Sequence, residues 1–478
     1  MDDLSEVFAS RSRALVIAPG GCGKTEIIAK AVACPQDGRQ LILTHTHAGV
    51  KSLRDRLREY GVSSRSYSIG TIAGFALKYA ISFPKSSGLS EFLPSEHDWR
   101  TVYPAGTRVL SSRVGRRIIG ASYTGLYVDE YQDCTVIQHK LIMSLADVLP
   151  CRIVGDPLQG IFGFGGNVLI DWFQDIFPHF ERLPDPRVPW RWHDNNEPLG
   201  NWLLKVRDWL LRGDPVDMRS APPGAVWMPL SDRPIVDQRK ACFRVLTEPG
   251  SAVAIHSVPQ RAHYLARCLR GRYTSMEEVE SKTLLKWCGD LERCRNTERA
   301  VAVLRFAFLC MTELSTKLRT IRKRVEAGDQ DIAKGLQKHR GIALALDEVV
   351  TGEGLGSVLH AFLLMEETPG CILYRRELWL DMKRAIKEYE KGDHDTLQDA
   401  AWAVRDRGRI WGRRVEHRTV SRTLLIKGLE FDHAIVLNAD DLDAKELYVA
   451  MTRGSKSLTV LSSRPVLLKS KPVFGSQP

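Results

Sequence analysis

The sequence predicts an α/β protein that contains two α/β units and a helical insertion in the second unit. Two observations predict this fold. Short apolar runs alternate with segments whose apolar residues recur at helical spacing, which is typical of a doubly wound parallel sheet. Between about Ser275 and Arg405 almost only helical patterns occur, and strand-like runs flank this region. At roughly 150 residues per domain, a chain of 478 residues has room for about three domains or subdomains.

The predicted strands are short, continuous apolar runs, as expected for strands buried on both faces. The first unit contains four of them: Ala14–Ala18, Gln40–Thr44, Gly125–Glu130 and Arg152–Asp156. The second unit contains Ser251–His256 and His433–Ala439. In the insertion, one long helix is expected from Glu298 to Ala327, with Gly328 as its cap, and another from Glu377 to Lys391, stopped by Gly392.

Charge and cysteine usage narrow the class of protein. The 68 Lys and Arg residues exceed the 57 Asp and Glu residues, which gives a net charge of +11 and favours a polyanionic partner such as nucleic acid. The ten cysteines show no regular spacing and are expected to be free thiols in a reducing compartment. No apolar run is long enough for a membrane span, and the first residues lack a signal-peptide core, so we expect a cytoplasmic protein.

A glycine-rich segment, APGGCGKT, follows the first predicted strand and precedes a helical run. This context is that of a P-loop, in which backbone N–H groups and a helix N-terminus hold phosphates. Lys24 would reach the β- and γ-phosphates, and Thr25 would bind Mg²⁺. The nucleotide-binding residues expected here are Ala18, Pro19, Gly20, Gly21, Cys22, Gly23, Lys24 and Thr25. The alternative is a glycine-rich turn in which Lys and Thr are accidental.

Two adjacent carboxylates end the third predicted strand, in the segment LYVDEYQD. Asp129 would bind Mg²⁺, and Glu130 would polarise the attacking water. The alternative is an acidic pair at a strand end with no catalytic role.

The segment VDEYQD closely resembles the nucleotide-hydrolysis motif of UvrD/Rep-like superfamily 1 (SF1A) DNA helicases, and six further segments resemble the motifs of this family in order. They are LTHTHAGVKSLRDRL (Ia), GTIAGFALKYA (Ib), VGDPLQGIFGFGG (III), VPWRW (IV), LLIKGLEFD (V) and LYVAMTRGSKSL (VI). The resemblance spans residues 14 to 461 and implies two RecA-like P-loop domains that bind ATP and Mg²⁺. It implies domain boundaries as well: 1–185 for the first RecA-like domain (1A) with a short 1B-like insertion near 82–117, 186–272 and 415–478 for the second (2A), and 273–414 for a helical 2B-like insertion.

The resemblance also implies roles for single residues. Gln159 and Arg191 would sense the γ-phosphate, Arg453 would act as an arginine finger, and Glu430 would approach the nucleotide sugar. Guanidinium groups at such positions neutralise the charge that develops on the γ-phosphoryl oxygens.

Contacts with DNA follow from the same resemblance. Thr46, His47 and Thr71 match family positions near the DNA backbone, and Phe162 and Phe164 match positions where aromatic rings stack on bases. Core packing is the alternative for both Phe residues. Two basic stretches, Thr316 to Arg324 and Arg405 to Arg414, would line a DNA groove or form a solvated face.

The chain departs from the family pattern at several points. No Gln precedes Ala14, where relatives read adenine, and Gly165 stands where many relatives have Arg. Motif V lacks the usual His, and the 1B-like segment is short. These departures favour DNA-dependent ATP hydrolysis over robust strand separation.

The leading functional prediction is a compact ATP-dependent translocase or helicase that moves 3′ to 5′ on single-stranded or tailed DNA. The alternative is a nucleotide-gated, DNA-sensing subunit that regulates a partner nuclease of OLD/TOPRIM type, as the helicase-like subunit of a Gabija-type antiphage defence system would. A P-loop enzyme acting on a small substrate leaves motifs Ia, Ib and III without a role.

Overall fold

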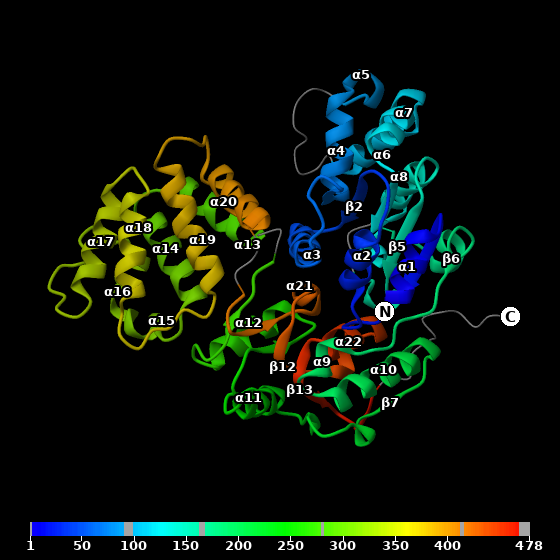
Figure 1. Cartoon of the computed structure of the whole chain (residues 1–478). Coiled ribbons are helices and arrows are strands. Elements are labelled where there is room, and N and C mark those ends of the chain that lie inside the picture. The colour runs from blue at the N-terminus through cyan, green and yellow to red at the C-terminus, as the bar shows by residue number, and fades with distance from the viewer. Residues whose placement is uncertain (1, 90–98, 162–167, 279–281, 412–414, 468–478) are drawn as a thin grey trace. The chain divides into compact units, whose positions relative to one another are not determined.

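The computed structural model divides the chain into two compact units (Figure 1). The first unit comprises Met1–Val226, Leu442–Ser457 and Pro465–Pro478, and the second comprises Trp227–Asp441 and Leu458–Arg464. The structure describes all residues except 1, 90–98, 162–167, 279–281, 412–414 and 468–478.

The first unit is built on a six-stranded sheet with the order β3-β2-β4-β5-β1-β6, in which every neighbouring pair is parallel. The strands are β1 (Arg13–Ile17), β2 (Gln40–Thr44), β3 (Tyr67–Thr71), β4 (Gly125–Val128), β5 (Cys151–Gly155) and β6 (Glu181–Arg182). A short antiparallel pair, β7 (Val216–Asp217) and β14 (Val466–Leu467), lies outside this sheet. Because the six strands are parallel, the loops that follow them meet at one edge, where ligands of such sheets usually bind.

Successive residues of the central strands point to opposite faces, and two apolar clusters result. Leu15, Leu41 and Leu126 belong to one cluster, whereas Val16, Ile42 and Tyr127 belong to the other. The helices of this unit are α1 (Asp2–Ser10), α2 (Lys24–Ala33), α3 (His47–Glu59), α4 (Ile72–Ser82), α5 (Pro84–Ser87), α6 (Trp99–Ser111), α7 (Arg113–Ser122), α8 (Val136–Ala146), α9 (Trp190–His193), α10 (Glu197–Arg212) and α22 (Ala444–Met451).

The second sheet has the order β10-β11-β9-β12-β13-β8, and β9 pairs in parallel with β11 and β12. Its strands are β8 (Ala225–Pro229), β9 (Ala252–Ile255), β10 (Thr274–Ser275), β11 (Arg418–Ser421), β12 (Phe431–Val436) and β13 (Gly454–Ser462). Helices α11 (Pro234–Val245), α12 (Pro259–Cys268) and α21 (Thr423–Ile426) belong to the same unit. The mixed α/β fold with two six-stranded sheets fits two RecA-like domains and confirms the predicted fold class.

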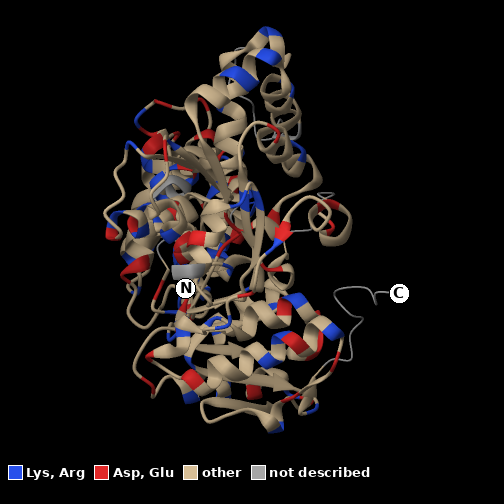
Figure 2. Ribbon diagram, turned by 45° about the vertical axis from the view of Figure 1, so that its right-hand side comes forward, with Lys and Arg blue, Asp and Glu red and all other residues tan. Residues whose placement is uncertain are grey.

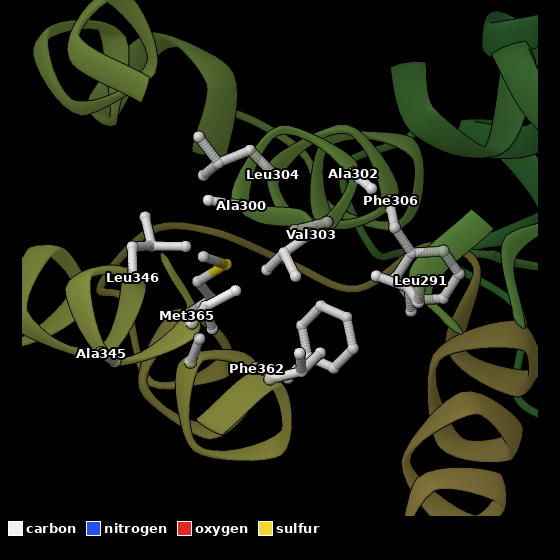
Figure 3. Packing of buried hydrophobic residues seen from close by; sticks show 14 of the residues in the cluster. Leu291, Ala300, Ala302, Val303, Leu304, Phe306, Ala345, Leu346, Phe362 and Met365 are labelled. Carbon is white, nitrogen blue, oxygen red and sulfur yellow. The ribbon is translucent and has the colours of Figure 1, made fainter. Parts of the chain in front are cut away.

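A helical insertion separates β10 from β11. Its helices are α13 (Lys282–Arg293), α14 (Asn296–Cys310), α15 (Leu314–Lys317), α16 (Arg319–Ala327), α17 (Arg340–Thr351), α18 (Gly356–Glu366), α19 (Arg376–Tyr389) and α20 (Leu397–Trp411). Figure 3 shows Val303, Phe306, Leu346, Phe362 and Met365 gathered between these helices, and all five side chains are buried.

The prediction of one helix from Glu298 to Ala327 is wrong, because this stretch forms α14, α15 and α16. After α14, Met311 is extended and forms an antiparallel bridge with Leu373, and the N–H of Thr312 donates to the carbonyl of Ile372 at 2.9 Å. Glu313 then has a positive φ of 58°, which a helix does not accommodate. The predicted cap at Gly328 is confirmed, with a φ of 84°.

The boundaries of the predicted 1A, 2A and 2B domains stay predictions. Residues 186–226 and 442–457, which those boundaries place in the second RecA-like domain, belong to the first compact unit. All ten cysteines are free thiols. Within the described ranges, no helix has the length and apolar character that would let it cross a membrane.

Candidate nucleotide-binding site

The predicted P-loop connects β1 to α2. The N–H of Cys22 donates to the carbonyl of Pro19 at 3.1 Å, and α2 begins at Lys24. Gly21 and Gly23 have φ values of 78° and 84°, in the left-handed region that favours glycine. Lys24 is 8% exposed, and its Nζ lies 3.4 Å from the carbonyl oxygen of Ala18 at the start of the loop. The loop therefore brings a helix N-terminus and a nearly buried ammonium group together.

The first two glycines of the loop are closely packed against other segments. A Cβ atom on Gly20 would lie 2.8 Å from Nε2 of Gln159, and a Cβ on Gly21 would lie 2.6 Å from the ring of Trp192. A neighbour would have to shift in both cases: the Gln159 amide ends a flexible side chain, whereas the Trp192 ring is rigid and buried. Motifs III and IV therefore contact the P-loop directly.

Asp129 and Glu130 follow β4 at the same edge of the sheet as the P-loop. The N–H of Glu130 donates to Oδ1 of Asp129 at 2.9 Å, and Glu130 adopts a positive φ of 54°. Such a conformation is uncommon for a residue with a side chain and is found more often at functional sites. Burial, followed by the charge of Glu130, raises the pKa of Asp129 to about 7, and the charge of Lys24 opposes this rise. Asp129 and Lys24 are thus within electrostatic reach of each other.

A chain of buried polar groups connects this carboxylate pair with motif III. The Gln132 amide donates to Glu130, and its Oε1 accepts from the N–H of Asp156 at 2.9 Å. Oδ2 of Asp156 accepts from Nε2 of Gln159 at 3.1 Å, and Oδ1 accepts from Nη2 of Arg207 at 3.0 Å. Burial opposes the charge on Arg207, but the Asp156 carboxylate outweighs it and raises the pKa of Arg207.

Motif IV contacts the P-loop through its backbone and its tryptophan. The N–H of Arg191 donates to the carbonyl of Gly21 at 3.1 Å, and its Nη1 donates to the carbonyl of Thr452 at 2.6 Å. Trp192 is 1% exposed and donates from Nε1 to the carbonyl of Gly454 at 2.7 Å. These bonds connect motif IV with both the P-loop and motif VI.

Motif VI approaches the P-loop along α22. The hydroxyl of Tyr448 accepts from the N–H of Gly20 at 2.9 Å. Arg453 is 1% exposed, and its Nε donates to the carbonyl of Val449 at 2.8 Å, while its Nη2 donates to Oγ1 of Thr452 at 3.1 Å. Arg453 therefore lies next to a residue that is itself close to Gly20, within the first unit.

The residues around the P-loop fit a nucleoside triphosphate with a divalent cation. The positive-φ glycines leave a cradle that side chains would fill, and Lys24 places a cation beside it. Thr25, in the first turn of α2, and Asp129 offer the hard oxygen atoms that Mg²⁺ prefers.

The predicted DNA-contact residues of the first unit lie at the starts of α3 and α4. Thr46 and Thr71 are N-caps of α3 and α4, and each hydroxyl accepts a backbone N–H at 3.0 Å, from Gly49 and Gly74. Because β2 and β3 are parallel neighbours, the two threonines lie at the same edge as the P-loop. His47, the first residue of α3, is exposed.

Glu430 belongs to the second unit, immediately before β12. Phe162 and Phe164 lie outside the described residues.

Sequence reasoning did not identify four residues of this site: Gln132, Trp192, Arg207 and Tyr448. Gln132 lies in the VDEYQD segment, Trp192 in motif IV and Tyr448 in motif VI, so their positions within these motifs could have indicated them. Arg207 lies in α10, outside every motif, and only its buried partner Asp156 reveals its role.

Parts of this chain are similar to known proteins. A family model described as an AAA domain matches residues 5–165. Gabija protein GajB of Bacillus cereus (strain VD045) is 27% identical over 200 residues, which cover 34% of this chain. The matched region spans 40% of the length of that relative. An arterivirus helicase, nonstructural protein 10 in complex with DNA, aligns with 53% of this chain and 50% of its own, at 16% identity and a TM-score of 0.27.

The fold and the site together define a helicase-like P-loop NTPase. The AAA-domain match over residues 5–165 agrees with the resemblance of the ordered motifs to UvrD-like superfamily 1 helicases, and the chain is similar over part of its length to Gabija protein GajB.

Proposed function

We propose that this protein hydrolyses ATP with Mg²⁺ at the P-loop in response to DNA and uses the energy to move 3′ to 5′ on single-stranded DNA. The observation that carries the proposal is the packing around Gly20 and Gly21. Gln159, Arg191 and Arg453 belong to three segments that all contact this loop or its immediate neighbours. This arrangement is expected if the three side chains act on phosphates that the loop binds.

Each residue of the P-loop and of the β4 end has a role in this proposal. The loop N–H groups and Lys24 bind the β- and γ-phosphates, and Glu130 orients the attacking water and accepts its proton. When bound, Mg²⁺ neutralises part of the phosphate charge, and Thr25 and Asp129 would hold it. The Glu130–Gln132–Asp156 chain fixes the position of the catalytic carboxylate relative to Gln159.

The arginines stabilise the transition state. Arg191 and Arg453 both bond to backbone carbonyls around α22 and its C-terminus, so their guanidinium groups are held near the loop before substrate arrives. Preorganised donors of this kind need no reorganisation during the reaction. Gln159 responds to the γ-phosphate. Trp190, 44% exposed beside Arg191, is available to stack on the base.

DNA binding rests on two features of the first unit. Thr46 and His47 lie just after β2, and Thr71 ends the neighbouring strand β3. Helices α4 to α7, in which Figure 2 shows several blue segments, carry basic residues and no Asp or Glu in their described part. The basic residues include Lys78, Lys85, Arg108, Arg113, Arg116 and Arg117. Phe162 and Phe164 would stack on bases.

A second candidate function is a nucleotide-gated, DNA-sensing subunit that regulates a partner nuclease in antiphage defence. The similarity to Gabija protein GajB favours it. In this case turnover and strand separation would depend on the partner, which we expect to be of OLD/TOPRIM type.

The test measures ATP turnover with and without single-stranded DNA, then strand separation on a 3′-tailed duplex. A motor does both without a partner, whereas a gated subunit hydrolyses little or fails to unwind until the partner is added. Glu130→Gln should bind ATP and lose turnover, and Glu181→Gln, an exposed carboxylate paired with Arg11, is the matched control. Wild-type turnover in Glu130→Gln would refute the assignment of the base.

Arg453→Ala should retain ATP binding and lose about 10³-fold or more in turnover, as for an arginine finger. Equal losses of binding and turnover would instead indicate a structural role for Arg453 in α22.

A further inference from the structure

A basic pocket lies at the edge of the first sheet opposite the P-loop. Arg39 directly precedes β2, and Tyr67 begins β3, whereas the P-loop follows β1 and Thr71 is the last residue of β3. Each of these strands has five residues, so the two edges are about 13 Å apart at roughly 3.3 Å per residue. The pocket has a volume of about 600 Å³. It is lined by Arg39, Arg54, Arg58, Val62, Ser64, Tyr67, Ser68 and Ile69.

The pocket is formed by the last turns of α3 and by the edge strand β3. Arg54 and Arg58 are four residues apart on α3 and therefore lie on one face of the helix. The N–H of Val62 donates to the carbonyl of Leu57, which turns the chain back toward β3. Because β3 is the first strand of the sheet order, this face has no further strand beside it.

The positive charge in the pocket exceeds the negative charge around it. Arg58 pairs with Asp55 at 3.3 Å, and Nε of Arg39 donates to the carbonyl of Tyr67 at 3.0 Å. Among the residues that the structure describes, Arg54 makes no ion pair or side-chain hydrogen bond. The pocket therefore has three guanidinium groups and one neighbouring carboxylate, and this excess of positive charge attracts anions.

We propose that the basic pocket binds the phosphate groups of a nucleotide-sized ligand, as a site separate from the P-loop. Guanidinium groups match phosphate oxygens in a bidentate geometry, and the hydroxyls of Ser64 and Ser68 add donors. A volume of about 600 Å³ lies within the roughly 300–1,000 Å³ typical of small-ligand sites. Phosphates can come from two sources, a free nucleotide or the backbone of a DNA strand, and both present the same chemistry.

The experiment uses the full chain with the Lys24→Ala substitution, which disables the P-loop and leaves the basic pocket as the nucleotide site under test. Binding of radiolabelled ADP is measured by equilibrium dialysis, and binding of a fluorescent oligothymidylate by anisotropy over a range of NaCl concentrations. Arg54→Ala/Arg58→Ala is compared with Arg56→Ala. Arg56 lies on the same helix but pairs with Glu26 and Glu59 and does not line the pocket.

A free-nucleotide site predicts that Lys24→Ala still binds ADP and that Arg54→Ala/Arg58→Ala weakens this binding by about tenfold or more, since each charged hydrogen bond contributes roughly a factor of ten. A backbone site predicts that oligothymidylate binding weakens and that its salt slope falls by about 1.4, or 0.7 for each lost guanidinium. Arg56→Ala should change neither. If the double variant and Arg56→Ala behave alike with both probes, the proposal is wrong, and an acidic protein segment becomes the candidate occupant. Should the double variant unfold early, Arg54→Gln removes one guanidinium and should weaken ADP binding or lower the salt slope by about 0.7, whichever source applies.

Discussion

Replacing Arg207 by methionine should strongly destabilise the first unit, because it leaves a buried carboxylate without its cation. Asp156 has no exposed side-chain area, and the side chain of Arg207 is 4% exposed. The guanidinium donates to Oδ1 from Nε at 3.3 Å and from Nη2 at 3.0 Å. Removing one partner of a buried ion pair costs about 3–5 kcal/mol, whereas replacing both partners is often nearly neutral.

The assay is urea unfolding followed by tryptophan fluorescence, with Arg207→Met, Asp156→Asn and the double variant compared. We expect Arg207→Met to lower the free energy of unfolding by about 3–5 kcal/mol and the double variant by less than about 2 kcal/mol, because no buried charge remains. The matched control is Arg212→Met on the same helix, whose exposed pair with Asp214 should be worth less than about 1 kcal/mol. Equal effects of Arg207→Met and Arg212→Met, or simple additivity in the double variant, would refute the reasoning.

Two further predictions concern other parts of the chain. Gly21→Ala should weaken ATP binding and lower the melting temperature, because its Cβ would meet the ring of Trp192. The control is Gly61→Ala, because Gly61 also has a positive φ but an added Cβ would have no atom within 4 Å. It measures the backbone strain without the clash, so equal effects of the two substitutions would contradict the packing argument. Burial lowers the pKa of His256 to about 4, and its Nδ1 accepts from the N–H of Val258 at 3.0 Å. As the pH falls below about 6.5, the imidazole is protonated in the unfolded chain but stays neutral in the folded one. The free energy of unfolding therefore falls between pH 6.5 and pH 4, and the loss amounts to about 1.4 kcal/mol by pH 5.5. Thermal melts of His256→Asn, which keeps an acceptor, should depend less on pH in this range, and an unchanged pH dependence would rule out His256 as its source.

The elements that the sequence predicted correctly are those defined by contiguous residues. The runs at Ala14–Ala18 and Gln40–Thr44 predict β1 and β2 because strands buried on both faces need continuous apolar residues. The P-loop was predictable for the same reason, since its glycines and Lys24 occupy one short segment. The division of the stretch from Glu298 to Ala327 into three helices was not predictable from local sequence. It depends on the pairing of Met311 with Leu373, far along the chain.

In the candidate site, too, contacts between residues far apart in the sequence could not be predicted. Asp129 and Glu130 were predictable from their position after an apolar strand. The bond from Gly20 to Tyr448 and the pair formed by Asp156 and Arg207 join distant segments, so no local pattern indicates them. The contact of Arg191 with Thr452 likewise joins motifs IV and VI in one compact unit, and no local pattern indicates it.

The bond between the Gly20 N–H and the Tyr448 hydroxyl joins residues that are 428 positions apart. During synthesis the ribosome supplies the glycine first, and at about 5–20 residues per second the tyrosine follows roughly 20 to 90 s later. For that interval the P-loop has no contact with α22, and neither Thr452 nor Arg453 has been made. A nascent chain therefore cannot complete this candidate site before α22 has been made, because the contacts of Tyr448, Thr452 and Arg453 form only then.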